Sequence, residues 1–254
     1  MKFFNTTVSR VLQIVSILGL LLTVRSAHAQ TTDTDEDKYT TVTTYGVTTN
    51  TNSGILGGFV FRHSKALPNL FQGKRQFRYL ALEIVNVKHP KEVQSQTPYS
   101  GARYVYNKQN YLFVVRPQYG REVSLFSRTA DEGIAINGIL AVGPSIGVIK
   151  PYYVQYTARP GQVDTRPFDP SLQPELIVGA GSFFQGFDKS KLTLGLNFKA
   201  AVAFELSAFR NNMTGLEIGF LAEAFPKEVV IMNATNNRSV YTSGFVTLFF
   251  GNKK

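Results

Sequence analysis

The fold is decided by residues 138–143, which read Gly-Ile-Leu-Ala-Val-Gly. If this stretch is a β-strand, its side chains alternate between two faces, and both faces are apolar. A strand of a soluble sandwich usually has one polar face, because that face meets water. In a membrane barrel the outer face meets lipid and the narrow interior accepts small residues. The stretch therefore favours a transmembrane β-barrel over a soluble β-sandwich.

The same period of two recurs along most of the chain. Gly, Asn, Asp and Pro cluster between the alternating runs, and helical periodicity is nearly absent. The pattern predicts an all-β fold, an antiparallel up-and-down membrane β-barrel of roughly eight strands. The count is open by one or two, because Arg116–Arg128 could form one bent strand or two. The runs are Gly54–Arg62, Phe77–Lys88, Asn110–Gln118, Arg121–Arg128, Gly133–Ala141, Ser145–Tyr156, Leu192–Phe209, Gly215–Ala224 and Val240–Phe250.

Aromatic residues near the strand ends also fit a membrane barrel. Tyr111, Tyr152 and Phe250 are examples, placed where an interfacial aromatic girdle would lie. The closing run Tyr241–Phe250 ends on Leu-Phe-Phe, as the last strand of an outer-membrane barrel commonly ends on an aromatic residue. It departs from that pattern because residues 251–254 follow it.

Residues 1–29 predict a secretory signal peptide. A short basic start is followed by the apolar run Val11–Val24 and by the small-residue site Ala27-His28-Ala29. Its removal would lower the net charge from +10 to +7, because Lys2, Arg10 and Arg25 would leave with it and no acid would. The chain has no cysteine, so neither disulfides nor a lipid-modified cysteine can stabilise or anchor it. Together with the strand pattern, this predicts the outer membrane of a Gram-negative cell envelope.

Residues 30–53 form a separate zone rich in Thr, Asp and Asn. Such a composition buries too little apolar surface to offset chain entropy, so it predicts a disordered leader. The expected organisation is a signal peptide at 1–29, a leader at 30–53 and an outer-membrane barrel at 54–254.

Three segments carry a resemblance to known proteins. They are residues 143–153, which read GPSIGVIKPYY, residues 216–228 with LEIGF and AFPKE, and the closing residues 245–251. The set resembles uncharacterised small outer-membrane β-barrel proteins of the Bacteroidota envelope. The resemblance implies a fold and a compartment, and it supplies no catalytic residue.

Arginines mark two candidate binding regions. Arg116 and Arg121 flank Pro117 and Gly120, which predict a break or turn between two strands. Across that turn the two arginines could clamp an anionic head group or glycan; the alternative is pairing with acids such as Glu122 or Glu132. Arg159 and Arg166 lie in the proline-rich segment Ala158–Pro174, which predicts a long outward loop, where a barrel usually carries recognition.

The remaining residues give little support for a catalytic or metal site. After cleavage only His63 and His89 remain as histidines, so neither a multi-histidine metal site nor a thiolate site is available. His63 and its neighbour Ser64 would point to opposite faces of a strand. We therefore expect no enzyme, no cofactor, no metal and no nucleic-acid partner. The expected partners are outer-membrane lipid and other envelope proteins.

The leading interpretation is a non-enzymatic envelope protein, structural or accessory to a surface or secretion complex. Two alternatives stay open at this point. One is a soluble periplasmic or secreted β-barrel that binds an apolar ligand. The other is an outer-membrane lipid-modifying hydrolase, which would need His63 or His89.

Overall fold

A computed structural model describes residues 39–254 apart from 98–99, 128–133, 160, 207–211 and 234. The predicted signal peptide and residues 30–38 of the predicted leader lie outside the described residues.

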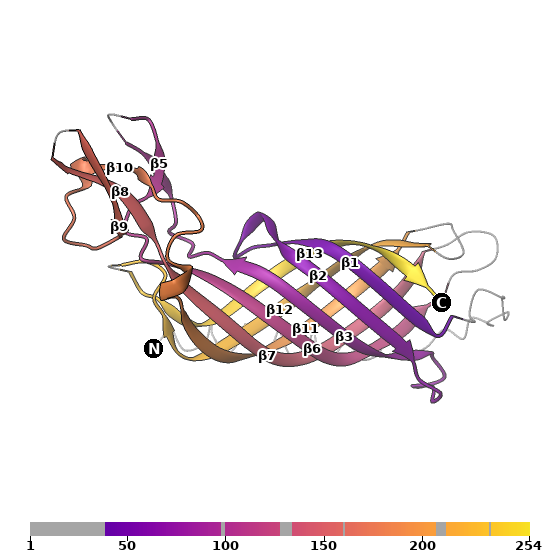
Figure 1. The fold of residues 1–254 in the computed structure, drawn as a ribbon. Coiled ribbons are helices and arrows are strands. Elements are labelled where there is room, and N and C mark those ends of the chain that lie inside the picture. Colours follow the sequence, from indigo (N-terminus) through magenta and orange to yellow (C-terminus); the bar gives the residue numbers. More distant parts are fainter. Residues whose placement is uncertain (1–38, 98–99, 128–133, 160, 207–211, 234) are drawn as a thin grey trace, which may run out of the picture. The chain divides into compact units, whose positions relative to one another are not determined.

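Within the described residues, eight long strands close into an antiparallel barrel (Figure 1). Barrel strands that follow one another along the chain are neighbours, so the topology is up-and-down. The first strand closes the barrel against the last, with Tyr45 opposite Phe250. The fold class predicted from the alternation is confirmed. In chain order the barrel strands are β1 (Thr41–Asn50), β2 (Gly54–Ala66), β3 (Gln76–Val87), β6 (Asn110–Phe126), β7 (Ala135–Pro151), β11 (Lys191–Glu205), β12 (Asn212–Val229) and β13 (Arg238–Lys253).

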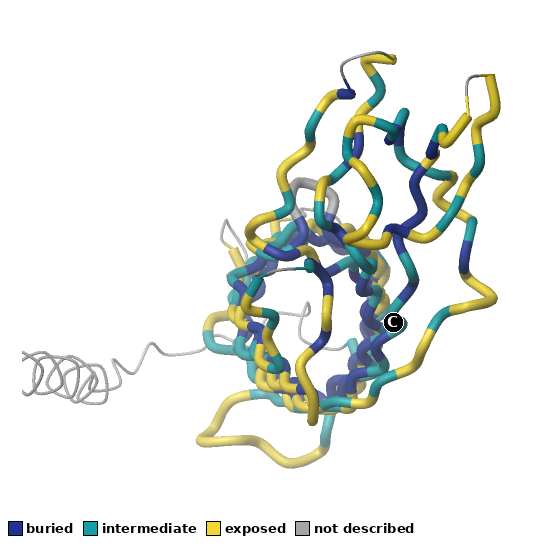
Figure 2. The backbone as a smooth tube through the Cα atoms, turned by 90° about the vertical axis from the view of Figure 1, so that its left-hand side faces the viewer, coloured by how far each residue is buried: buried dark blue, intermediate teal, exposed yellow. Residues whose placement is uncertain are grey.

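Each barrel strand turns one set of side chains outward and the other inward. Strand β11 is the clearest case, since Leu192, Leu194 and Leu196 face outward and are 73%, 67% and 70% exposed, whereas Lys199 faces inward and is 0% exposed. Figure 2 views the barrel end-on, with the strands forming a ring. The outer face is thus apolar while polar groups lie inside, the reverse of a soluble barrel.

The stretch that suggested the fold lies in the middle of β7. Leu140 and Val142 are exposed on the outer face, and Ile139 and Ala141 are buried inside. Both faces are apolar because one meets the surroundings of the barrel and the other packs in its interior.

Strand β1 corrects the prediction of a disordered leader over 30–53. Thr44 and Thr48 of this strand are buried inside the barrel, and Tyr45 and Val47 are exposed outside. Threonine is β-branched and suits a strand, but its polarity made the segment look solvated. Strand β1 pairs with β2 on one side and with β13, at the far end of the sequence, on the other, and local composition does not report either pairing.

Strand β6 corrects the prediction of a turn between Arg116 and Arg121. It runs unbroken through Pro117 and pairs with β3 along this region, where Pro117 lies opposite Leu82. On its other side the ladder with β7 has paired positions at Val115 and Tyr119 but not between them. Because proline lacks an N–H, it removes bonds on one side only and the other side keeps the strand straight.

The long connections of the barrel meet at one end, here called the loop end. They comprise residues 88–109 and 152–190; the opposite end, where β1 begins and β13 finishes, is here called the terminal end (Figure 1). The connections contain two small sheets, one with β4 and β5 and one ordered β10-β8-β9. Among the described residues no helix has the length and apolar character to cross a membrane. The minor elements are β4 (Gln94–Gln96), β5 (Arg103–Val105), β8 (Tyr153–Arg159), β9 (Gln162–Pro167), β10 (Ile177–Ala180) and the 3-10 helices η2 (Pro174–Leu176) and η3 (Phe187–Lys189).

The segment Ala158–Pro174, predicted as a loop, therefore contains a strand. Strand β9 pairs with β8, placing Arg166 opposite Val154. Beneath them lies a small apolar cluster that supplies the burial this extra sheet needs; its members are Tyr104, Tyr152, Val154, Tyr156, Phe168 and Ile177.

Inward-facing glycines mark places where two barrel strands come too close for a side chain. A Cβ on Gly120 would lie 2.1 Å from the carbonyl oxygen of Leu140 and 2.6 Å from the Cα of Ala141. Because these are backbone atoms, the strands would have to separate. We expect Gly120→Val to destabilise the barrel by at least about 1–3 kcal/mol, the usual range for over-packing, measured by urea unfolding in detergent.

The matched control is Gly244→Val on β13. A Cβ there would meet only Thr51, at 3.9 Å, so the same substitution should leave the unfolding midpoint nearly unchanged. Equal effects at the two glycines would contradict the steric explanation.

Candidate functional site: the barrel interior and the loop end

Lys199 lies at the centre of a buried charged network inside the barrel. Its Nζ is 2.7 Å from Oε1 of Glu83 on β3 and 2.7 Å from Oε1 of Glu217 on β12. It also lies 3.3 Å from the hydroxyl oxygen of Tyr79. One ammonium group thus links opposite walls of the barrel.

Arg116 extends the network on one side. Its Nε and Nη2 donate to the two carboxylate oxygens of Glu223, each at 2.9 Å, and its Nη1 lies 3.6 Å from Oε2 of Glu83. The Ser145 hydroxyl donates to Glu223 at 2.5 Å. The two-pronged contact matches the planar guanidinium to a carboxylate and fixes both side chains.

Arg62 extends the network on the other side. Its Nη2 donates to Oε1 of Glu122 at 3.1 Å, and its Nη1 lies 3.5 Å from Oε2 of Glu217. The Ser64 hydroxyl donates to the second oxygen of Glu122 at 2.7 Å. Arg62 also lies over the ring of Phe249, 5.2 Å from its centroid.

These contacts form one alternating series of charges, here called the ion-pair chain. Within the described residues it joins three cations to four carboxylates, every one of them buried. Opposite charges alternate along it, so each cation compensates the burial of two carboxylates. The ion-pair chain occupies the lumen, with all seven of its charged residues buried. Its order is Glu122, Arg62, Glu217, Lys199, Glu83, Arg116 and Glu223.

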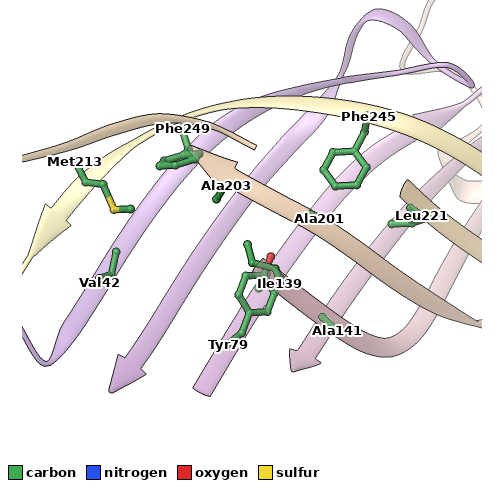
Figure 3. Close-up of a cluster of buried hydrophobic side chains, with 11 residues drawn as sticks. Val42, Tyr79, Ile139, Ala141, Ala201, Ala203, Met213, Leu221, Phe245 and Phe249 are labelled. Atoms are coloured by element: carbon green, nitrogen blue, oxygen red, sulfur yellow. The ribbon is translucent and has the colours of Figure 1, made fainter. Parts of the chain in front are cut away.

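Apolar side chains fill the interior toward both ends of the barrel. Along β3 the inward residues run from Tyr79 through Glu83 to Val85 and Val87. Figure 3 shows the cluster that contains Tyr79 and Phe249, and a second cluster contains Val85 and Val87. The interior of this barrel is a packed core, as expected when eight strands enclose it.

The structure places the predicted pair Arg116 and Arg121 on opposite faces of β6. Arg116 points inward and binds Glu223, whereas Arg121 is exposed on the outer face. The two side chains therefore do not come together as a clamp. Arg116 joins an internal network, as the alternative expected, with acids from other strands. Glu122 pairs with Arg62 instead, and Glu132 lies outside the described residues.

The second predicted pair, Arg159 and Arg166, lies at the loop end on β8 and β9. Arg166 donates to Asp164 at 3.2 Å, and its guanidinium carbon is 4.9 Å from the ring centroid of Tyr156. Arg159 is exposed beside the β8–β9 turn and lies opposite Gln162. Both guanidinium groups thus belong to the folded connections outside the barrel.

Polar contacts hold the two connections together, and one lysine among them contacts the barrel. The backbone N–H of Val105 donates to the hydroxyl oxygen of Tyr152 at 3.0 Å. Lys108 is buried, pairs with Glu92 and lies 4.0 Å from the ring centroid of Tyr111. Burial lowers the pKa of Lys108, and the Glu92 carboxylate opposes that shift. The loop end is therefore a folded surface that contains its own ion pair, between Lys108 and Glu92.

An aromatic patch links the loop end to the outer barrel wall. Phe183 and Phe187 contact Phe113 of β6, with ring centroids 5.7 and 6.2 Å apart, and Phe184 next to them is 79% exposed. Lys150 donates to the carbonyl of Gln185 at 2.8 Å and lies over the Phe187 ring. The patch extends the aromatic girdle of the strand ends.

The residues of the enzyme alternative are not assembled for catalysis. His63 contacts the Thr43 hydroxyl through Nδ1 at 3.0 Å on the outer side, whereas Ser64 is buried inside with Glu122. His89 accepts from the backbone N–H of Lys91 at 3.1 Å, at the loop end. Across the described part of the chain, no three His, Cys, Asp or Glu side chains are grouped to hold a metal.

Sequence reasoning found Arg116 but missed Lys199, Glu217 and Glu223. A usable signal exists, because each is a charged residue at an inward position of a strand whose outward residues are apolar. Lys199 lies between Phe198 and Ala200. Charges at core positions are costly unless paired, so several of them in neighbouring strands predict an internal network.

Comparison with solved structures finds small bacterial surface barrels. One is Ail, the attachment invasion locus protein of Yersinia pestis, in complex with the heparin analogue sucrose octasulfate: 9% identity, TM-score 0.38, covering 85% of this chain and 99% of that one. Another is Neisserial surface protein A: 10% identity, TM-score 0.38, covering 85% and 97%. No family model and no curated protein sequence matches the chain.

Proposed function

We propose that this protein is a non-enzymatic outer-membrane barrel of the cell envelope that presents a folded surface at its loop end. The observation that carries the proposal is the inverted distribution of polarity. Large apolar side chains cover the outer wall, while seven buried charged residues form the ion-pair chain inside. Exposed leucines such as Leu194 and Leu196 are costly in water and favourable against lipid acyl chains.

A transport role is disfavoured by the filled interior. The ion-pair chain and the apolar clusters at both ends occupy the lumen, and open aqueous channels belong to barrels with about sixteen strands. The binding function of the protein would then reside outside the barrel, on residues 88–109 and 152–190. Their two small sheets and apolar cluster make a preformed surface suited to another envelope component. The signal peptide at 1–29 and the relationship to Bacteroidota envelope proteins stay predictions.

The first test separates a bilayer barrel from a soluble one. We expect the mature protein in the sarkosyl-insoluble outer-membrane fraction, with a band on SDS gels that shifts on boiling. In planar bilayers the folded protein should give no steady conductance, because side chains fill its lumen. Recovery in the soluble periplasm without a shifting band would reject the proposal in favour of a soluble ligand-binding barrel.

The hydrolase alternative has its own test. Replacing His63 and His89 each by alanine should leave the lipid composition of the outer membrane unchanged. A change in lipid acylation that depends on either histidine would overturn the non-enzymatic proposal.

A further inference from the structure

Three cations lie side by side on the outer wall of the barrel. Strand pairing puts Lys65 of β2 directly opposite Arg78 of β3, and Arg78 directly opposite Arg121 of β6. All three are exposed. Residues directly opposite in a sheet share one face, so the three side chains form a single row, here called the basic row.

The positive charge of the basic row is not balanced by acidic side chains among the described residues. None of its three members forms an ion pair with a carboxylate among the residues that the structure describes. Its neighbours in register are Thr41 on β1 and Leu140 on β7, so no acid closes the row at either end. Like charges directly opposite one another destabilise a sheet, and an anion between them would remove that repulsion.

The basic row lies near the terminal end of the barrel. Lys65 is next to the last residue of β2, and Arg78 is the third residue of β3. Two positions further along the same outer faces lie Leu80 and Tyr119, and on β2 His63 is followed by Phe61. The row thus borders the apolar band, at the level where a membrane places its head groups.

We propose that the basic row binds the phosphate of anionic glycerophospholipids in the periplasmic leaflet. The orientation rests on the proposed function, since outer-membrane barrels place their long loops outside the cell. Strands about 4.8 Å apart spread three cations over about 10 Å, enough for one phospholipid head group. Two guanidinium groups can each donate two parallel bonds to phosphate oxygens, and Lys65 adds a point charge. Arg121 thus shares the proposed phosphate site with Lys65 on β2 and Arg78 on β3, and not with Arg116.

The test uses the full mature chain in nanodiscs of phosphatidylglycerol with an excess of phosphatidylcholine. Native mass spectrometry of the released protein gives the ratio of the two lipids still bound. The wild type should retain phosphatidylglycerol well above its bulk share. Because each cation near an anionic surface contributes roughly fivefold in affinity, the triple variant K65Q/R78Q/R121Q should reduce this enrichment by at least about tenfold.

A charge-matched control is available at the loop end of the barrel. The triple variant K88Q/K191Q/R238Q also removes three exposed cations, but these are not neighbours in register, and it should keep the enrichment. Adding inorganic phosphate at constant ionic strength separates the two sources of the anion. If the added phosphate abolishes the lipid enrichment and phosphate adducts appear on the protein, the site binds free phosphate. That result would overturn the lipid proposal.

Failure of the inference is distinguishable from failure of the proposed function. Equal enrichment in wild type and K65Q/R78Q/R121Q, with both bands shifting on boiling, would overturn the basic row alone. A wild type that neither enters nanodiscs nor shifts would reject the outer-membrane barrel itself. If the triple variant does not fold, R78Q removes the middle cation only and should still lower the enrichment about fivefold; unchanged binding there also counts against the proposal.

Discussion

Replacing Lys199 by methionine is expected to destabilise the barrel by about 3–5 kcal/mol. The loss of one partner from a buried pair leaves a buried charge uncompensated, and this is what makes such changes costly. Here two carboxylates are affected, because Glu83 and Glu217 both lie 2.7 Å from the lysine Nζ. Each would keep only its longer contact, to Arg116 at 3.6 Å and to Arg62 at 3.5 Å. The measurement is urea unfolding of the refolded protein in detergent, followed by the band that shifts on boiling.

Two comparisons isolate the cause of this effect. Lys191→Met, on the same strand but exposed, should change stability by no more than about 0.5 kcal/mol. Adding E83Q and E217Q to Lys199→Met should recover part of the loss, because the stranded charges are then gone. If Lys199→Met unfolds at the wild-type midpoint, the ion-pair chain contributes nothing to the stability of the barrel.

Replacing Leu196 by arginine is expected to cost about 2–4 kcal/mol in a bilayer, the range for a basic residue near the midplane on the lipid face of a barrel. Leu196 lies in the middle part of β11 and is 70% exposed. In water, a leucine so exposed could be exchanged for arginine at no cost. A loss of stability in L196R would therefore show that the outer wall contacts lipid.

The control for this substitution is Leu70→Arg, in the connection between β2 and β3 at the terminal end. Leu70 is 61% exposed but lies outside the barrel strands, so its replacement should change stability by less than about 0.5 kcal/mol. Unfolding of all three proteins from phospholipid vesicles gives the comparison. Equal stability of L196R and L70R would mean that the outer wall is solvated.

The fold was largely readable from the sequence because alternation is a local property. The run at 138–143 is apolar on both faces, and the period of two recurs in runs such as Leu192–Phe209; these patterns predicted a membrane barrel. Strand β1 was missed because its threonines resemble a solvated leader, and pairing with both β2 and β13 orders them. The continuity of β6 through Pro117 was missed for a related reason, since the supporting ladder comes from β3.

The candidate sites were harder to predict because they depend on register. Arg121 was identified as a residue that meets an anion, but its neighbours Lys65 and Arg78 are set by pairing across two strand interfaces. The same holds for the ion-pair chain, in which Lys199 contacts acids from β3 and β12. A one-residue shift between strands would move each of these side chains to the other face.

The closure of the barrel by its first and last strands has a consequence for how the protein is made. Thr40 donates its hydroxyl hydrogen to the carbonyl of Lys254, across 214 residues of chain. Until β13 has emerged, β1 and β12 both keep an unpaired edge, and such edges are sites of aggregation. The cylinder thus cannot close before β13 is available for pairing, and contacts this distant in sequence form slowly. During that interval the apolar strands of the unclosed sheet must be kept from pairing with other chains.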